Sequence, residues 1–104
     1  MSAEKELVKN ILEEVKESID LFYQQKTGEA LQQFDLVLGK VMTMVDTLFG
    51  YKEAHADFSL DEEKVKGVLT EALTALEDKD MILLADIIQY DFVEYVEELL
   101  NTME

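Results

Sequence analysis

The sequence predicts an all-α fold in which a single domain, residues 1–104, forms an up-down-up-down four-helix bundle. Three observations support this prediction. Apolar residues recur every three or four positions in four successive segments, which is the period of an amphipathic helix. No proline interrupts these segments, and two short turns and one longer loop separate them. The chain is also 48% apolar over 104 residues, which suffices for one hydrophobic core.

The first two helices are expected at about residues 3–26 and 29–49. Each gathers its apolar side chains on one face when successive residues are placed at steps of about 100°. The first face contains Leu7, Val8, Ile11, Leu12, Val15, Ile19, Phe22 and Tyr23. The second contains Ala30, Leu31, Phe34, Val37, Leu38, Val41, Met44, Val45, Leu48 and Phe49. Between the two segments, Gly28 is expected to end the first helix and Thr27 to cap the second.

The third helix is expected at about residues 60–78, after a longer loop within residues 50–58, part of which can also extend the second helix. Ser59-Leu60-Asp61-Glu62 matches the capping-box pattern, so Ser59 is expected to cap the third helix. Asp78-Lys79-Asp80 is the expected hinge, with Asp80 capping the fourth helix. Because the hinge contains neither glycine nor proline, the alternative is that the third and fourth helices form one continuous helix. The apolar face of the third helix comprises Val65, Val68, Leu69, Ala72, Leu73, Ala75 and Leu76.

The fourth helix, at about residues 81–100, carries more apolar residues than one buried face requires. Its expected core face comprises Met81, Leu84, Ala85, Ile88, Phe92, Tyr95, Val96 and Leu99. Leu83, Ile87 and Tyr90 recur at spacings of four and three on the opposite side, interleaved with acidic residues. These three residues are therefore the predicted protein-binding site, either a homodimer seam or a landing site for a partner. The alternative is that the chain itself covers the fourth helix on both sides.

The charge of the chain limits its partners. The net charge is −15, from 24 acidic residues against nine lysines and no arginine. Residues 53–104 alone contain 15 acidic residues and only three lysines. Such a surface repels nucleic-acid phosphates and anionic lipids, so neither nucleic acid nor a membrane is an expected partner. The N-terminal residues lack the basic and apolar regions of a secretory signal, and no apolar run is long enough to span a bilayer. A cytoplasmic location is therefore expected, with a second protein or another copy of the chain as the partner.

Catalytic, metal and cofactor sites are not expected. The chain has no cysteine, which excludes thiol nucleophiles and thiolate metal sites. The single histidine, His55, is interpreted as a solvated loop residue. A di-iron bundle would need Glu-x-x-His on two helices, whereas Glu53 and His55 are two residues apart. No calcium loop, glycine-rich phosphate loop or nucleophile–base pair is recognisable either. The sequence is therefore interpreted as that of a protein that is not an enzyme.

Two family resemblances have functional implications. Asp57-Phe58-Ser59-Leu60-Asp61 resembles the Asp-Ser-Leu motif of acyl carrier proteins, in which the serine carries phosphopantetheine at a helix start; here Phe58 stands between the Asp and the Ser. The length, the acidic helices and the turns at 25–31 (QKTGEAL) and 76–80 (LEDKD) resemble the flagellar export chaperones, four-helix bundles that bind flagellin. The stretch 75–86 (ALEDKDMILLAD) is similar to small bacterial helical proteins of unassigned function.

The chaperone resemblance transfers no binding residue, because the flagellar export chaperones usually begin with an Asn-Pro-Tyr-like segment and this chain has no proline. For the acyl carrier resemblance, the alternative is that Ser59 only caps a helix. The expected function is that of a non-enzymatic helical adaptor or a chaperone-like protein-binding module. The alternatives are a self-associating homodimeric bundle and an acyl-carrier-like protein.

Overall fold

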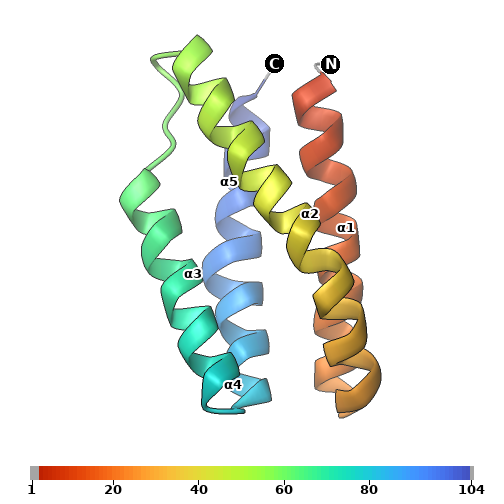
Figure 1. Cartoon of the computed structure of the whole chain (residues 1–104). Coiled ribbons are helices and arrows are strands. Elements are labelled where there is room, and N and C mark those ends of the chain that lie inside the picture. The colour runs from red at the N-terminus through yellow and green to blue at the C-terminus, as the bar shows by residue number, and fades with distance from the viewer. Residues whose placement is uncertain (1–2, 104) are drawn as a thin grey trace.

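Four helical rods form the molecule, and their order confirms the predicted all-α bundle. The computed structural model describes residues 3–103. The first two rods are α1 (Ala3–Tyr23) and α2 (Thr27–Ala54), and the third is α3 (Glu62–Glu77). The fourth rod is continuous but has three parts: α4 (Met81–Asp86), a π-helical segment η1 (Ile87–Val93) and α5 (Glu94–Thr102). Successive rods run in opposite directions, so the topology is up-down-up-down (Figure 1).

The two short turns have the same backbone geometry. After α1, the Lys26 amide donates to the Leu21 carbonyl (3.0 Å) and the Gln25 amide to the Phe22 carbonyl (3.0 Å). After α3, the Asp80 and Lys79 amides donate in the same pattern to the carbonyls of Ala75 (2.9 Å) and Leu76 (3.1 Å). This is the Schellman motif, which satisfies the last helical carbonyls and requires a left-handed residue at its centre. Gln25 (φ 61°) and Lys79 (φ 58°) are these residues.

The prediction that Gly28 ends the first helix and Thr27 caps the second is therefore wrong. The first helix ends three residues earlier than expected, and Gly28 lies in the first turn of α2. Lys26 occupies the N-cap position of α2 without a side-chain hydrogen bond. Thr27 is the first helical residue, and its side chain lies outside the described part of the structure. Gln25 adopts the left-handed conformation, which is strained for every residue with a side chain and is normally occupied by glycine.

The N-termini of the third and fourth rods show how acidic side chains cap helices here. Asp61, rather than the predicted Ser59, is the cap of α3: its carboxylate accepts a hydrogen bond from the Lys64 amide at 3.1 Å. Asp80 caps α4 as predicted, accepting from the Leu83 amide at 3.1 Å. Because Lys79 is left-handed and Asp80 caps a new helix, α3 and α4 are separate helices rather than one.

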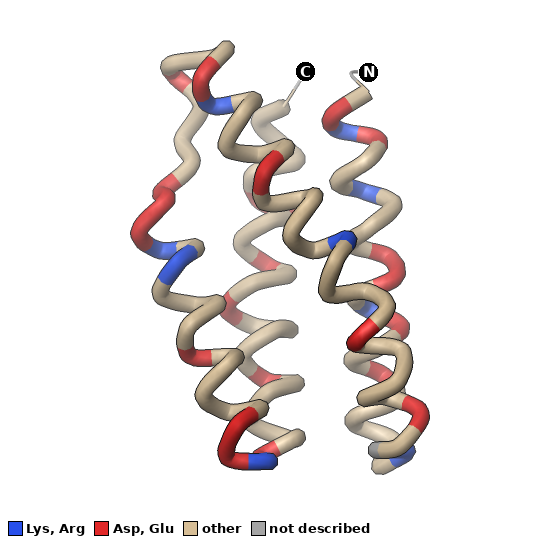
Figure 2. Tube along the Cα trace, viewed as in Figure 1, with Lys and Arg blue, Asp and Glu red and all other residues tan. Residues whose placement is uncertain are grey.

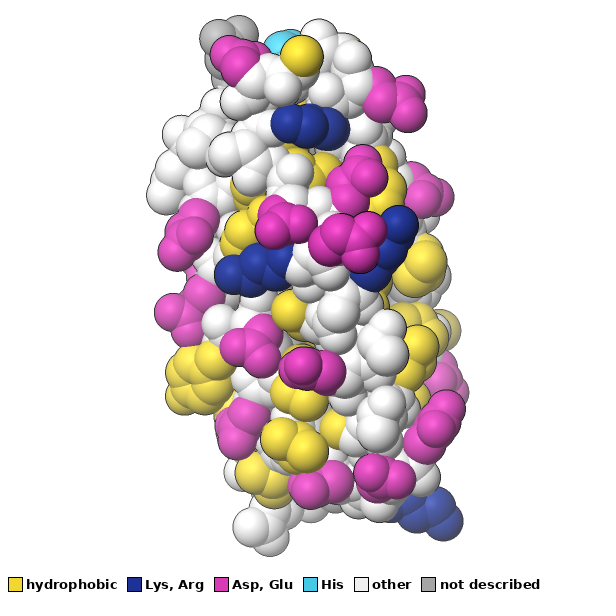
Figure 3. Space-filling view, turned by 90° about the vertical axis from the view of Figure 1, so that its left-hand side faces the viewer, with side chains coloured by type: hydrophobic (Ala, Val, Ile, Leu, Met, Phe, Trp, Pro, Cys, Tyr) yellow, Lys and Arg dark blue, Asp and Glu magenta, His cyan; other side chains and the backbone are white. Residues whose placement is uncertain are grey.

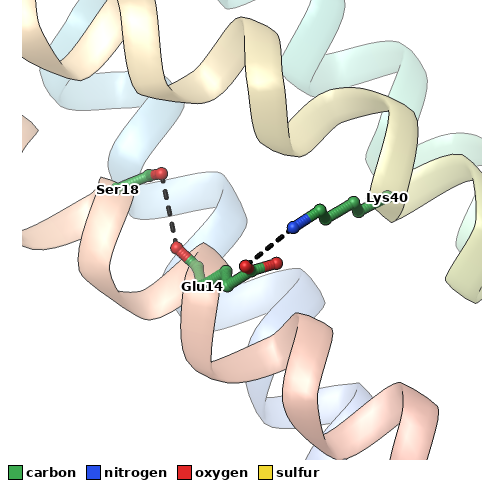
Figure 4. A network of polar contacts seen from close by, with 3 residues as sticks. All are labelled: Glu14, Ser18 and Lys40. Atoms are coloured by element: carbon green, nitrogen blue, oxygen red, sulfur yellow. Dashed lines mark hydrogen bonds and ion pairs between the residues drawn. The ribbon is translucent and has the colours of Figure 1, made fainter.

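A contiguous hydrophobic core runs the length of the bundle, and most of the predicted apolar faces contribute to it. Two residues assigned to the face of the first helix, Leu7 and Tyr23, are instead exposed. Among the side chains that the structure describes, Ser18 is the only polar one buried in the core. Its hydroxyl donates to the carbonyl of Glu14 (3.4 Å), and the Glu14 carboxylate forms an ion pair with Lys40 of α2 (2.8 Å; Figure 4). Because both charged groups are exposed, this pair contributes little to stability.

The loop between α2 and α3 is shorter than predicted, because α2 continues to Ala54. Phe58 and Leu60 of this loop are buried in the core, and the Asp61 amide donates to the Tyr95 hydroxyl at 2.8 Å. The Lys52 ammonium donates to loop carbonyls, including that of Phe58. The loop is thus attached both to the end of α2 and to the fourth rod.

The helices do not pack equally around the bundle. α1 packs against α2 and against all three parts of the fourth rod, and α3 packs against α4 and η1. α2 packs extensively on α1 and forms no comparable contact with any other helix. Figure 1 shows α2 running obliquely across the bundle, from the lower end of α1 towards the upper end of α3. The ring of four helices is therefore left open between α2 and α3.

Candidate functional site

An apolar groove of about 300 Å³ lies where α2 and α3 fail to close against each other. All twelve of its lining residues are apolar: Val15, Phe34, Leu38, Val41, Met42, Leu69, Ala72, Leu73, Leu76, Leu84, Ile88 and Phe92. α2 and α3 form its two walls, while α1 and the fourth rod form its floor. Such a groove offers dispersion contacts and burial of apolar surface, but no side chain that could take part in acid–base or nucleophilic chemistry.

The π-helical segment shapes the floor of this groove. Ile88 and Phe92 line the groove, and both belong to η1. A π turn holds one residue more than an α turn, because its hydrogen bonds run from i to i+5. Residues that a uniform α-helix would place on other faces are therefore rotated towards the interior. Val93, at the end of η1, is buried for this reason, although it does not belong to the predicted core face. Ile87, at the start of η1, is also buried, but it keeps α-helical spacing from Leu83.

The rims of the groove expose apolar side chains to solvent. Met42 of α2 is 50% exposed and Leu73 of α3 is 51% exposed, and both also line the groove. In the space-filling view turned towards α3, apolar side chains lie in patches between acidic ones (Figure 3). Exposed apolar residues around a concave apolar surface are typical of a site that a partner covers.

Acidic side chains follow these exposed apolar residues along the same helix faces. Asp35 and Asp46 lie seven residues before and four residues after Met42, so they share its outward face on α2. Glu77 lies four residues after Leu73 on α3. All three carboxylates are exposed, and within residues 3–103 none of them forms an ion pair. Figure 2 shows such acidic positions along both walls, with fewer lysines between them.

The predicted binding residues on the fourth rod do not form one surface. Leu83 and Tyr90 are 46% and 62% exposed, but Ile87 between them is 8% exposed and belongs to the core. The Ile87 amide donates to the Leu83 carbonyl, so these two residues keep α-helical spacing. Ile87 is buried because η1 packs against both α1 and α3. Leu83 and Tyr90 thus remain separate exposed positions, with a buried residue between them.

Tyr23 of α1 lies beside this part of the fourth rod. Its hydroxyl donates a short hydrogen bond to the Asp86 carboxylate, with the two oxygens 2.6 Å apart. Partial burial raises the pKa of the Tyr23 hydroxyl above its ordinary value, and the bond to Asp86 with its negative charge raises it further. The contact joins α1 to the last residue of α4, directly before η1 begins. We interpret it as a structural link between two rods.

His55 and Ser59 are the two residues that the sequence offered for a metal site or for cofactor attachment. Both lie near the C-terminal end of α2. His55 is half-buried rather than freely solvated: its ring stacks on Tyr51 (centroids 3.9 Å apart), and its Nδ1 is 3.1 Å from the Tyr51 carbonyl oxygen. That contact orders the end of the helix. Ser59 is exposed and precedes the first residue of α3 by three positions, so it does not stand at the helix start that the acyl-carrier arrangement uses.

Neither the groove nor the polar clusters provide a metal site. Across the part of the chain that the structure describes, no group of three or more histidine or acidic side chains comes together to hold an ion. The groove itself was not predicted, because it requires the consecutive helices α2 and α3 to stay apart, and the periodicity within each helix does not show which neighbours it packs against. Leu73 was assigned to the core, and Met42 lay outside the predicted face of the second helix. Met42, an apolar residue outside the predicted buried face, is the one signal in the sequence that pointed towards the groove.

Comparison with known families covers almost the whole chain. The domain of unknown function DUF8042 matches residues 1–102. The chain belongs to this family. No curated protein and no solved structure matches the chain significantly. Among residues 3–103, no helix combines the length and the apolar character needed to cross a membrane.

Proposed function

We propose that this protein is a non-enzymatic, chaperone-like binding module that holds a helical segment of another cytoplasmic protein in the groove between α2 and α3. The observation that carries the proposal is the open side of the bundle. A four-helix bundle normally buries its core by closing all four neighbouring helix pairs. Here α2 leaves one pair open, and the exposed interior is lined by apolar side chains alone.

A helix is the segment that suits this opening best. Both walls of the groove are helices, and an amphipathic helix laid between them would complete the packing that the α2–α3 pair lacks. The half-exposed Met42 and Leu73 would then be covered. The proposal includes no catalytic role, because the lining contains no titratable, hydroxyl or amide side chain.

A homodimer is the second candidate, and exposed residues of the fourth rod favour it. Ile82, Leu83 and Tyr90 are all large, apolar or aromatic, and exposed. They lie on a different part of the molecule from the groove, since none of them lines it. The two functions therefore predict contacts at different residues.

Site-specific photo-crosslinking distinguishes these functions. Leu73, at the rim of the groove, is replaced by p-benzoylphenylalanine, and cells producing the variant are irradiated. We expect a covalent adduct with a different protein, which mass spectrometry then identifies. Leu36, an exposed leucine of α2 outside the groove, is the control position and should give no such adduct.

Other positions of the label give the alternative outcomes. An adduct of twice the chain mass from a label at Tyr90 would support the homodimer. If labels at both Leu73 and Met42 give no adduct above the Leu36 control, the binding function of the groove is refuted.

A further inference from the structure

We infer that the partner segment is a short, basic amphipathic helix, with an apolar stripe that enters the groove and lysine or arginine side chains that lie against its acidic rims. This inference rests on the proposed function, because it names the chemistry of the occupant of the same groove. The length of the groove, its volume and the charge of its rims each restrict the partner segment.

The length of the groove sets the length of the segment. Its lining on α2 extends from Phe34 to Met42, and on α3 from Leu69 to Leu76. At about 1.5 Å per residue, these stretches are roughly 10–12 Å long. A partner helix lying along them is in contact for about two turns. Residues at i, i+3 or i+4, and i+7 would then face the groove.

The volume sets the number of anchoring side chains. An apolar cavity of about 150 Å³ holds one benzene molecule. A groove of about 300 Å³ accordingly has room for about two side chains of leucine or phenylalanine size. With no polar group in the lining, these anchors gain affinity from burial and gain little specificity from hydrogen bonds.

The charge of the rims sets the polar face of the segment. Asp35 and Asp46 flank Met42 on α2, and Glu77 follows Leu73 on α3, so each rim places an acidic side chain beside its exposed apolar residue. Lys66, on the same side of α3, already pairs with Glu63 at 3.9 Å. The chain as a whole has a net charge of −15, which attracts basic segments and repels acidic ones. Lysines or arginines beside the apolar stripe would therefore meet unpaired carboxylates on both rims.

Designed peptides test this inference on the full-length protein. The basic probe is a 15-residue helical peptide with leucines at i, i+4 and i+7 and lysines on its flanks, and the acidic probe has glutamates at the lysine positions. Binding of each peptide is measured by fluorescence anisotropy at low and at physiological salt. We expect the basic peptide to bind and to weaken as salt rises, because salt screens exposed charges. The acidic peptide should bind at least about tenfold more weakly.

Two sets of protein variants locate the charge effect. The rim variant combines Asp35→Asn, Asp46→Asn and Glu77→Gln. The matched control combines Glu13→Gln, Asp20→Asn and Glu94→Gln, three exposed carboxylates on α1 and α5, so none of them shares a helix face with Met42 or Leu73. Both variants change the net charge equally. We expect the rim variant to weaken binding of the basic peptide about three- to tenfold, and the control by less than about twofold.

A third variant, Met42→Ser with Leu73→Ser, tests the groove itself, and all variants are checked for unchanged helicity by circular dichroism. Weaker binding in this variant supports the groove as the site. If it binds the basic peptide as well as the wild type does, the proposed function fails. Two results would leave the groove as the site but overturn the inference of a basic partner. In both, Met42→Ser with Leu73→Ser weakens binding. In the first, the acidic peptide binds the wild type as tightly as the basic peptide does; in the second, the rim and control variants weaken binding of the basic peptide equally.

Discussion

Ile87 and Leu83 lie four residues apart on the same rod, and in a regular α-helix they would share one face. In the structure they differ in burial: Ile87 is 8% exposed, because η1 packs against both α1 and α3, whereas Leu83 is 46% exposed. Replacing each by alanine therefore tests this difference in burial directly. The substitutions remove similar volumes of apolar side chain, so any difference in stability reflects their surroundings.

The expected magnitudes follow from burial. Truncating a buried isoleucine to alanine costs about 2–5 kcal/mol, since it loses transfer free energy and leaves a cavity. Burying a whole leucine side chain is worth about 1.5–3 kcal/mol, and Leu83 buries only about half of its surface. Leu83→Ala should thus cost about 1 kcal/mol. For a domain of this size, about 1 kcal/mol corresponds to roughly 4–8 °C in melting temperature.

Thermal and urea unfolding followed by circular dichroism measure both free energies of unfolding. Ile87→Ala should lower the melting temperature by at least about 10 °C, and Leu83→Ala by about 5 °C. Val93→Ala, at the other end of the segment, serves as a second buried position and should also be strongly destabilised. Equal, small losses at positions 83 and 87 would show that Ile87 is not buried, and the packing of η1 between α1 and α3 would be refuted.

Three further predictions concern the helix ends and one titrating contact. Asp61→Ala should cost about 0.5–2 kcal/mol of unfolding free energy, whereas Ser59→Ala should change it by no more than about 0.5 kcal/mol; the reverse order in urea unfolding would restore Ser59 as the cap. Lys79→Gly should stabilise the protein by up to about 1 kcal/mol, because glycine adopts the left-handed conformation at this position without steric cost, and a lower melting temperature would contradict the Schellman geometry. The raised pKa of Tyr23 means that its contact with Asp86 stabilises the fold below the unfolded tyrosine pKa of about 10 and loses this effect as the pH rises further. In an ultraviolet titration, Tyr23→Phe should remove phenolate absorbance that develops above the ordinary tyrosine range, and a loss of absorbance near pH 10 instead would refute the shift.

Local sequence determined the parts of this structure that depend on neighbouring residues. Helical periodicity located all four rods, because burial of one stripe requires apolar residues at three- and four-residue spacing. Asp80 was predicted as a cap because its carboxylate needs only an amide three residues away. The acidic surface was also readable from the sequence, since charged side chains stay in water wherever the helices pack.

Tertiary packing decided the rest. The position of Val93 in the core depends on a π turn, and no residue pattern in the fourth helix distinguishes that turn from an α turn. The burial of Ile87 depends on η1 packing against both α1 and α3. The helix ends at Gln25 and Lys79 use left-handed residues other than glycine, whereas Gly28 was expected to end the first helix. Backbone hydrogen bonds to the preceding helix outweigh the local strain. The groove depends on α2 packing against α1 and not against α3. That choice reflects the fit between side chains far apart in the sequence, which local periodicity does not encode.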